Sequence, residues 1–204
     1  MTATISTISE LEALYGAPPD TSIRKEVDHL TAEYQLLIER SPFVALATAG
    51  STGMDCSPKG DPAGFVRVVD AKTIRIPDRK GNNRLDSLRN IIDDPRAGLL
   101  FLIPGVGETL RVNGRASLIV EPDVLAEFEV RGRRPSLVME VTVGSAYYHC
   151  SKAVIRSDLW NPDAWGDPAE APTCGQMIAA ITRGEIDGDE VDRTYPQRQL
   201  DNLY

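Results

Sequence analysis

A short stretch of the chain, residues 76–85, gathers the side chains best suited to bind an anion; its sequence is IPDRKGNNRL. Arg79, Lys80 and Arg84 supply charged hydrogen-bond donors. Gly81 lets the backbone approach a ligand closely. The stretch lies where a predicted strand ends and a predicted helix begins, and helix N-termini receive phosphates readily because they expose unpaired N–H groups. The spacing indicates either a phosphate site or a solvated loop before a basic surface helix.

Two short strands precede this stretch and one helix follows it. The strands are predicted over residues 65–69 and 73–76, and the helix over residues 83–93. Asn82 or Asn83 is expected to cap the helix, because asparagine side chains accept hydrogen bonds from the first-turn N–H groups. Arg67 lies in the first of these strands, where it either points outward into solvent or faces a bound anion.

The remaining pattern predicts a mainly β protein with peripheral helices. Six or seven short strands without sustained β–α alternation fit a closed antiparallel barrel better than a doubly wound sheet. Further strands are predicted over residues 43–49, 54–57, 98–103, 109–120 and 137–143. Further helices are predicted over residues 28–41, 122–130, 148–155 and 175–182.

Three parts are expected along the chain. Residues 1–27 have weak periodicity and form an N-terminal arm with one short helix. Residues 28–165 contain all the predicted strands and form the barrel domain. Residues 166–204 form a C-terminal helix followed by an acidic tail.

The charge of the chain is unevenly distributed. Its 204 residues include 30 Asp or Glu and 22 Lys or Arg, a formal net charge of -8. Nucleic acids and acidic membranes are excluded as broad partners, because neutralising phosphates needs surplus Lys and Arg. Residues 157–204 carry ten acidic and three basic side chains, a net of -7. Residues 75–90, the basic island, carry five basic and two acidic ones, a net of +3, which indicates a small anionic ligand.

Cysteine usage and hydropathy predict a cytoplasmic protein. The cysteines, Cys56, Cys150 and Cys174, are odd in number and widely spaced, as is typical of reduced thiols. The first fifteen residues lack the basic start and apolar run of a signal peptide. The longest apolar run covers ten residues, 97–106, and a membrane span needs about 20.

The rest of the sequence offers little chemistry of its own. The two histidines, His29 and His149, are too far apart to indicate a metal site, and we expect none. No nucleophile, base and acid can be grouped, so the catalytic residues are unknown and any redox activity would reside in a cofactor. A second basic cluster, Arg131, Arg133 and Arg134, is expected to contact the acidic tail or a neighbouring chain.

Several segments share, in order along the chain, the sequence pattern of one known family. They are residues 43–48 (FVALAT), 55–61 (DCSPKGD), 64–68 (GFVRV), 77–86 (PDRKGNNRLD), 100–105 (LFLIPG), 110–116 (LRVNGRA), 148–153 (YHCSKA) and 156–160 (RSDLW). Together they resemble the pyridoxamine 5′-phosphate oxidase-like family of FMN-binding split-barrel proteins. The likeness covers about residues 30–165 and favours the phosphate interpretation of the basic island.

This resemblance implies a six-stranded antiparallel split β-barrel of the FMN-binding type. It also implies a homodimer with FMN at the subunit interface. Residue by residue, the implied phosphate or ribityl contacts are Arg67, Arg79, Lys80, Asn83 and Arg84. Those near the flavin ring or ribityl chain are Asp78, Ser57 and Lys59. The second copy of the chain is expected to contribute Arg111, Lys152 and Trp160.

The function implied by the resemblance is an FMN-dependent oxidoreductase that acts on an unidentified small molecule. Two alternatives stay open: a flavin-binding module for storage or sensing without turnover, and a deazaflavin-dependent reductase. The phosphate-binding island favours FMN over haem, which other split barrels bind. The oxidases close over their vitamer with a C-terminal Trp and Arg pattern, which residues 187–204 lack, so oxidation of pyridoxamine phosphate does not follow from the likeness.

Overall fold

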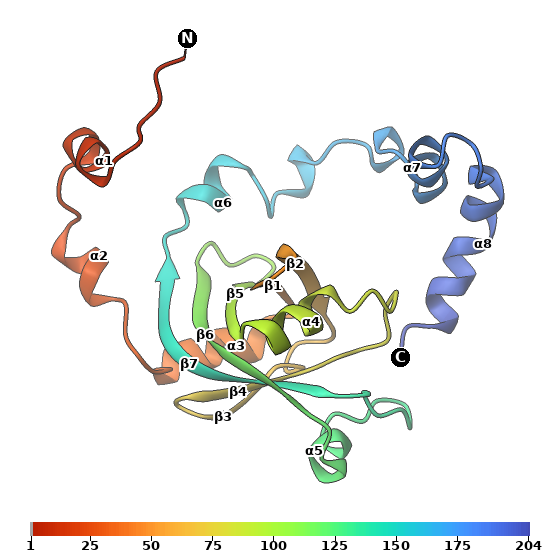
Figure 1. Cartoon of the computed structure of the whole chain (residues 1–204), viewed down its shortest axis with the longest axis horizontal. Coiled ribbons are helices and arrows are strands. Elements are labelled where there is room, and N and C mark those ends of the chain that lie inside the picture. The colour runs from red at the N-terminus through yellow and green to blue at the C-terminus, as the bar shows by residue number, and fades with distance from the viewer. Residues whose placement is uncertain (1) are drawn as a thin grey trace.

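The computed structural model describes residues 2–204, which fold around one antiparallel sheet (Figure 1). Its strands are β1 (Phe43–Gly50), β2 (Gly53–Gly60), β3 (Arg67–Asp70), β4 (Thr73–Pro77), β5 (Arg96–Leu102), β6 (Thr109–Ile119) and β7 (Val138–His149). The helices near the sheet are α3 (Ala32–Arg40), α4 (Asp86–Asp93) and α5 (Pro122–Ala126). The expected class, mainly β with peripheral helices, is confirmed.

The strands follow the order β2-β1-β5-β6-β7-β4-β3, and every neighbouring pair is antiparallel. Within residues 2–204, β2 and β3 are edges that do not pair with each other, so the sheet is open rather than closed. It has seven strands, as the residue pattern allows, and not the six-stranded barrel that the resemblance implies. Two hairpins, β1–β2 and β3–β4, flank the three strands β5, β6 and β7.

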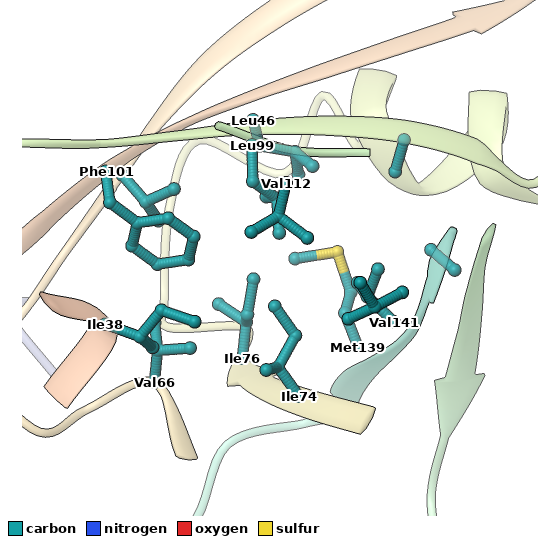
Figure 2. Close-up of a cluster of buried hydrophobic side chains, with 14 of the residues drawn as sticks. Ile38, Leu46, Val66, Ile74, Ile76, Leu99, Phe101, Val112, Met139 and Val141 are labelled. Carbon is teal, nitrogen blue, oxygen red and sulfur yellow. The ribbon is translucent and has the colours of Figure 1, made fainter. Parts of the chain in front are cut away.

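One face of the sheet surrounds the hydrophobic core (Figure 2). Side chains from opposite parts of the sheet point toward one another, among them Leu46, Phe101, Ile74 and Met139, all fully buried. Ile38 of α3 lies among them and is also fully buried. Burying such side chains contributes about 1.5–3 kcal/mol each, so this cluster is the main source of stability.

The other face of β1 and β5 carries small or apolar residues. Burial alternates along both strands, as a strand with one core-facing side requires. Ala47 pairs with Gly98 and Ala45 pairs with Leu100, and all four are only partly buried. This leaves a partly exposed apolar face on the outside of the sheet.

Helix α4 covers one end of the core and fixes the position of the basic island. Leu88 and Ile91 belong to the core cluster. The Asn90 side chain donates from Nδ2 to Thr48 Oγ1 of β1 at 3.2 Å, and both groups are buried. A Cβ at Gly50 would lie 2.4 Å from Asn90 Oδ1, so this approach of helix and strand requires glycine. At the other end of α4, the Ser87 hydroxyl donates to Asp55 of β2, so the N-terminus of the helix lies beside β2.

Two predicted boundaries are wrong for the same reason. Strand β7 was expected to end at residue 143 but continues to His149, and the helix expected over residues 148–155 is only α6 (Lys152–Arg156). The extra residues pair with β6, where Tyr148 lies opposite Leu110. Pairing with a long neighbouring strand thus overrides the local pattern, which contains no signal for a strand of this length.

Both ends of the chain contain helices outside the sheet. Helices α1 (Ile8–Tyr15) and α2 (Asp20–Arg24), where one helix was expected, contain no buried residue. Helix α7 (Cys174–Ile181) confirms the helix predicted over residues 175–182. The acidic tail contains a further helix, α8 (Gly188–Asp201), which was not predicted. Two short 3₁₀ helices, η1 (Pro162–Ala164) and η2 (Pro168–Glu170), lead to α7.

In the described chain, no helix is both long and apolar enough to cross a membrane.

The pair α7–α8 forms because of contacts that the sequence pattern does not show. The Asp192 carboxylate accepts from the backbone N–H of Gly175 at 2.7 Å and from the Thr173 hydroxyl. A Cβ at Gly175 would lie 2.0 Å from the carbonyl oxygen of Gly188, so the two helices cross at glycine. After this pair the chain returns toward the sheet and ends near the loop between β4 and α4 (Figure 1).

We predict that Phe101→Ala lowers the free energy of unfolding by about 3–5 kcal/mol, because it empties a fully buried aromatic position. Chemical denaturation measures the loss. Phe43→Ala is the matched control, since Phe43 lies on a neighbouring strand and is 40% exposed. Equal losses for the two variants would contradict the core as described.

Candidate functional site

A cavity of about 830 Å³ lies between β2 and the loop that joins β4 to α4. Successive side chains of a strand point to opposite faces, so Ser57 and Lys59 of β2 lie on the same face, and both line the cavity. The loop contributes most of the basic island. Seven of the predicted site residues line the cavity: Ser57, Lys59, Asp78, Arg79, Lys80, Asn83 and Arg84.

The cavity is strongly cationic. Its lining contains six Lys or Arg and two Asp, a formal charge of +4. Two of the cations, Arg133 and Arg134, were missed as site residues from the sequence, as was Tyr204. Their basic cluster was recognisable, but only the fold brings residues 133–137 opposite the basic island. A small anionic ligand is the complement of such a cavity.

Two ion pairs hold its inner walls. Lys59 Nζ of β2 lies 2.8 Å from Asp78 Oδ1, directly after β4, and both side chains are largely buried. Arg79 Nε lies 2.7 Å from Asp61 Oδ2, with side chains that are 16% and 3% exposed. Arg79 also donates through Nη1 to the carbonyl oxygen of Phe128 at 2.8 Å. Strands β2 and β4 do not pair within the described chain, so these contacts bridge the opening of the sheet.

Two further cations of the island, Arg84 and Lys80, lie at the rim. Arg84 Nε lies 2.7 Å from Asp86 Oδ2, yet its side chain is 73% exposed. Lys80 is exposed and donates to Asn202 Oδ1 near the end of the chain. Exposed pairs of this kind contribute little to stability, so both side chains are available to a ligand.

The loop before α4 turns through two left-handed residues. Asn83 has φ 59 and Leu85 has φ 62, a conformation that asparagine tolerates and leucine rarely adopts. Leu85 is the N-cap residue and makes no side-chain cap, so the predicted capping by Asn82 or Asn83 is wrong. Instead Asn82 Oδ1 accepts from the backbone N–H of Arg84 at 3.0 Å. The uncapped first turn of α4 leaves N–H groups free beside the cavity.

The hydroxyl group of Ser57 is oriented by a buried contact. It donates to Asp55 Oδ2 at 2.9 Å, and the Ser87 hydroxyl donates to the same oxygen at 2.5 Å. Asp55 therefore joins β2 to the first turn of α4. This bridge holds the Ser57 side of the cavity at a fixed distance from the basic island.

Four predicted site residues do not line the cavity. Arg67 is half exposed and stacks over the Phe128 ring, with Glu127 beside it. Trp160 donates from Nε1 to the carbonyl oxygen of Val106 at 2.8 Å. Lys152 begins α6. Arg111 belongs to a separate cluster on the outer side of β6 and β7.

That cluster combines cations with two aromatic rings. The Arg111 guanidinium lies 4.1 Å from the centre of the Tyr147 ring, and Arg111 Nη2 donates to Glu26 Oε2 at 3.0 Å. The Tyr147 hydroxyl lies 3.1 Å from His149 Nδ1. Burial, together with the positive charges of Arg111 and Lys25, lowers the pKa of His149, so its ring is neutral at pH 7. Among the described residues, Arg111 Nε is buried without a hydrogen-bond partner.

The sequence matches a family model described as pyridoxamine 5′-phosphate oxidase over residues 30–150, more than half of the chain. The chain belongs to this family. A search of the curated proteins finds no match. The matched residues contain the whole sheet and the basic island, whereas helices α1, α2, α7 and α8 lie outside them.

Solved structures resemble part of the chain. HupZ of Group A Streptococcus is 21% identical, with a TM-score of 0.48 over 59% of this chain and 94% of that one. A Clostridium acetobutylicum protein related to general stress protein 26 is 15% identical, with a TM-score of 0.43 over 58% of this chain and 86% of that one. The name of the second protein places it in the pyridoxinephosphate oxidase family.

We predict that Arg79→Met lowers the free energy of unfolding by about 3 kcal/mol, because it leaves the buried Asp61 carboxylate without its cation. Chemical denaturation at pH 7 measures this loss. Arg84→Met, which breaks an exposed pair in the same island, is the control and should cost about 0.5 kcal/mol or less. Adding Asp61→Asn to Arg79→Met should recover part of the stability; no recovery would contradict the pairing.

We predict that His149 titrates below the ordinary histidine value of 6.5 and that Arg111→Met raises its pKa by removing a neighbouring positive charge. NMR of the ring protons follows the titration. Because the folded state binds fewer protons than the unfolded chain, the contribution of His149 to stability falls as the pH drops below about 6.5. Arg115→Met, an exposed change on the same strand, is the control. An unmoved midpoint in Arg111→Met would exclude the charge effect.

Proposed function

We propose that the chain binds FMN in the cationic cavity and acts as an oxidoreductase on a small molecule. The observation that carries this proposal is the cavity itself, with a formal charge of +4 and a volume in the range of small-ligand sites. Charged donors and free helix N–H groups fit a phosphate group, which haem lacks. Membership of a family whose members commonly bind FMN supports the choice of flavin.

The cations divide into two roles in this proposal. Lys59 and Arg79 are already paired with carboxylates, so they shape the walls, and Lys59 orients Asp78 toward the ribityl chain or ring. Lys80 and Arg84 are exposed at the rim, so they receive the phosphate together with the backbone around Asn83. Ser57 faces the same space with its hydroxyl oxygen held by Asp55.

When bound, FMN would supply the hydride and electron chemistry that the side chains lack. Among the described residues that line the cavity there is no histidine or cysteine, and we assign no acid or base there. In residues 2–204, no three His, Cys, Asp or Glu side chains gather to hold a metal ion. The chain itself would therefore bind and orient, with positive charge placed around an anionic ligand.

A homodimer is part of the proposal. Arg111, Lys152 and Trp160 do not line the cavity of their own chain, so they could reach a flavin only from a second copy. The outer apolar face of β1 and β5 is suited to such contact, because its small residues permit close packing. The neutral His149 and the unpartnered Arg111 Nε would then lie near the interface.

Arg67 is left out of the proposed site. Its guanidinium contacts Glu127 and the Phe128 ring, and it does not line the cavity. The cation of β2, Lys59, lies inside the cavity instead.

We predict that Arg84→Ala weakens FMN binding by about 1.5–3 kcal/mol, the scale of one charged hydrogen bond, which is roughly ten- to a hundredfold in Kd. Quenching of flavin fluorescence measures the affinity. Riboflavin, which lacks the phosphate, should bind the variant and the unchanged protein equally. Arg96→Ala is the matched control, because Arg96 is equally exposed and pairs with Asp94 at the other end of α4.

The outcomes separate the proposal from its alternatives. Failure of the purified protein to take up FMN, with uptake of a deazaflavin, would overturn the choice of cofactor. An equal loss of riboflavin and FMN affinity in Arg84→Ala would show that Arg84 does not contact the phosphate. Anaerobic photoreduction followed by mixing with oxygen or quinones distinguishes an oxidoreductase from a storage or sensing module, since only the former passes electrons on during turnover.

A further inference from the structure

The last residues of the chain return to the cavity and contact its cations. Lys80 Nζ donates to Asn202 Oδ1, and Arg133 Nη1 donates to the main-chain oxygen of Tyr204. The Tyr204 hydroxyl donates to Asp61 Oδ1 at 2.7 Å, on the same carboxylate that pairs with Arg79. Asn202 and Tyr204 lie more than a hundred positions from the basic island in the sequence, so only the fold brings them next to it.

The aromatic ring of Tyr204 lies near two cations. Its centre lies 5.5 Å from the Arg79 guanidinium and 5.5 Å from the Arg131 guanidinium. Both distances lie within the range of cation–π attraction. The Asp61 carboxylate raises the pKa of the Tyr204 phenol, so the hydroxyl keeps its proton and acts as a donor. The predicted contact between the Arg131 cluster and the C-terminal tail is thereby confirmed.

Tyr204 is shared by two hollows. It lines the main cavity and a second one of about 570 Å³, and Lys59, Arg79 and Lys80 line both. The second hollow has apolar walls from Phe65 and Leu203. Moving Tyr204 aside would free the cations that the tail now contacts.

The tail therefore uses the interactions that a phosphorylated aromatic ligand would use. An aromatic ring stacks on guanidinium groups, and oxygen atoms accept from Lys80 and Arg133. Asn202 supplies a neutral amide oxygen to Lys80, whereas a phosphate supplies charged oxygens, which bind cations about twice as strongly. A phosphate-bearing ligand can thus displace the tail from the same donors.

We propose that Asn202 and Tyr204 form a displaceable plug that occupies the cationic cavity until a phosphorylated aromatic ligand takes their place. The nature of that ligand rests on the proposed function, whereas the docking of the plug does not. In this arrangement the apparent affinity for ligand is reduced by the fraction of molecules in which the plug is docked.

The first test compares FMN affinity in the full chain with that in Tyr204→Ala and in Asn202→Ala. We expect binding to tighten about three- to tenfold in both variants, because a weakened plug competes less. Tyr15→Ala is the matched control, since it removes an exposed tyrosine that touches neither hollow. Circular dichroism verifies that each variant is folded. An unchanged or weaker FMN affinity would overturn the proposal, a weaker one by making Tyr204 part of the binding wall.

The second test follows the plug directly. Fluorotyrosine is incorporated, and the ¹⁹F signal of Tyr204 is assigned by its absence in Tyr204→Phe. Adding FMN, or inorganic phosphate as a probe that needs no flavin site, should move this signal toward that of an exposed tyrosine. If FMN fails to bind while phosphate moves the signal, the proposed function fails and the plug stands. A signal that neither probe moves would overturn the plug.

Discussion

Two ion pairs across the opening of the sheet are the constraint on which the site depends. Strands β2 and β4 do not pair within residues 2–204, so no backbone hydrogen bonds hold this side together. Lys59 with Asp78 and Arg79 with Asp61 supply the connection instead. Because these groups are largely buried, each charge depends on its partner rather than on water, and removing one leaves the other uncompensated. The position of the basic island follows from these pairs, and so does the cavity between them.

The site accordingly separates structural cations from those free to bind. Lys59 and Arg79 lie inside and are neutralised by carboxylates, whereas Arg84 and Lys80 lie at the rim, where water screens their partners. Arg79 has the widest set of contacts, because it touches Asp61, the Phe128 carbonyl oxygen and the Tyr204 ring. Through this side chain the edge of the sheet, the segment after α5 and the C-terminal tail meet at one point. A ligand that displaces the Arg79 side chain would therefore also change the contacts of the tail.

The predicted helices and strands agree with the structure where a local sequence signal sets the element. They differ where pairing with a distant segment sets its length. The alternation of β6 and the apolar face of α4 predicted those elements to within three residues, because one core-facing side sets each pattern. The prolongation of β7 to His149 depends on pairing with β6 and has no local signal. Helix α8 has one, the Asp187 N-cap, which the prediction of an acidic tail overlooked. Of the candidate site residues, those in the basic island and on β2 gather at one cavity, since both segments flank the same opening. Arg67 lies elsewhere, with its guanidinium beside Glu127 and over the Phe128 ring.

By itself, the sequence determined the family, the mainly β class and the chemistry of the basic island, because each depends on short runs of neighbouring residues. It also determined the charge imbalance between an acidic C-terminal segment and that island. Only the tertiary structure decided that Arg133 and Tyr204 join the island at one cavity, and that the acidic segment ends against it. The physical reason is that these contacts join residues far apart in the chain, and their strength depends on burial and distance, which no local pattern encodes.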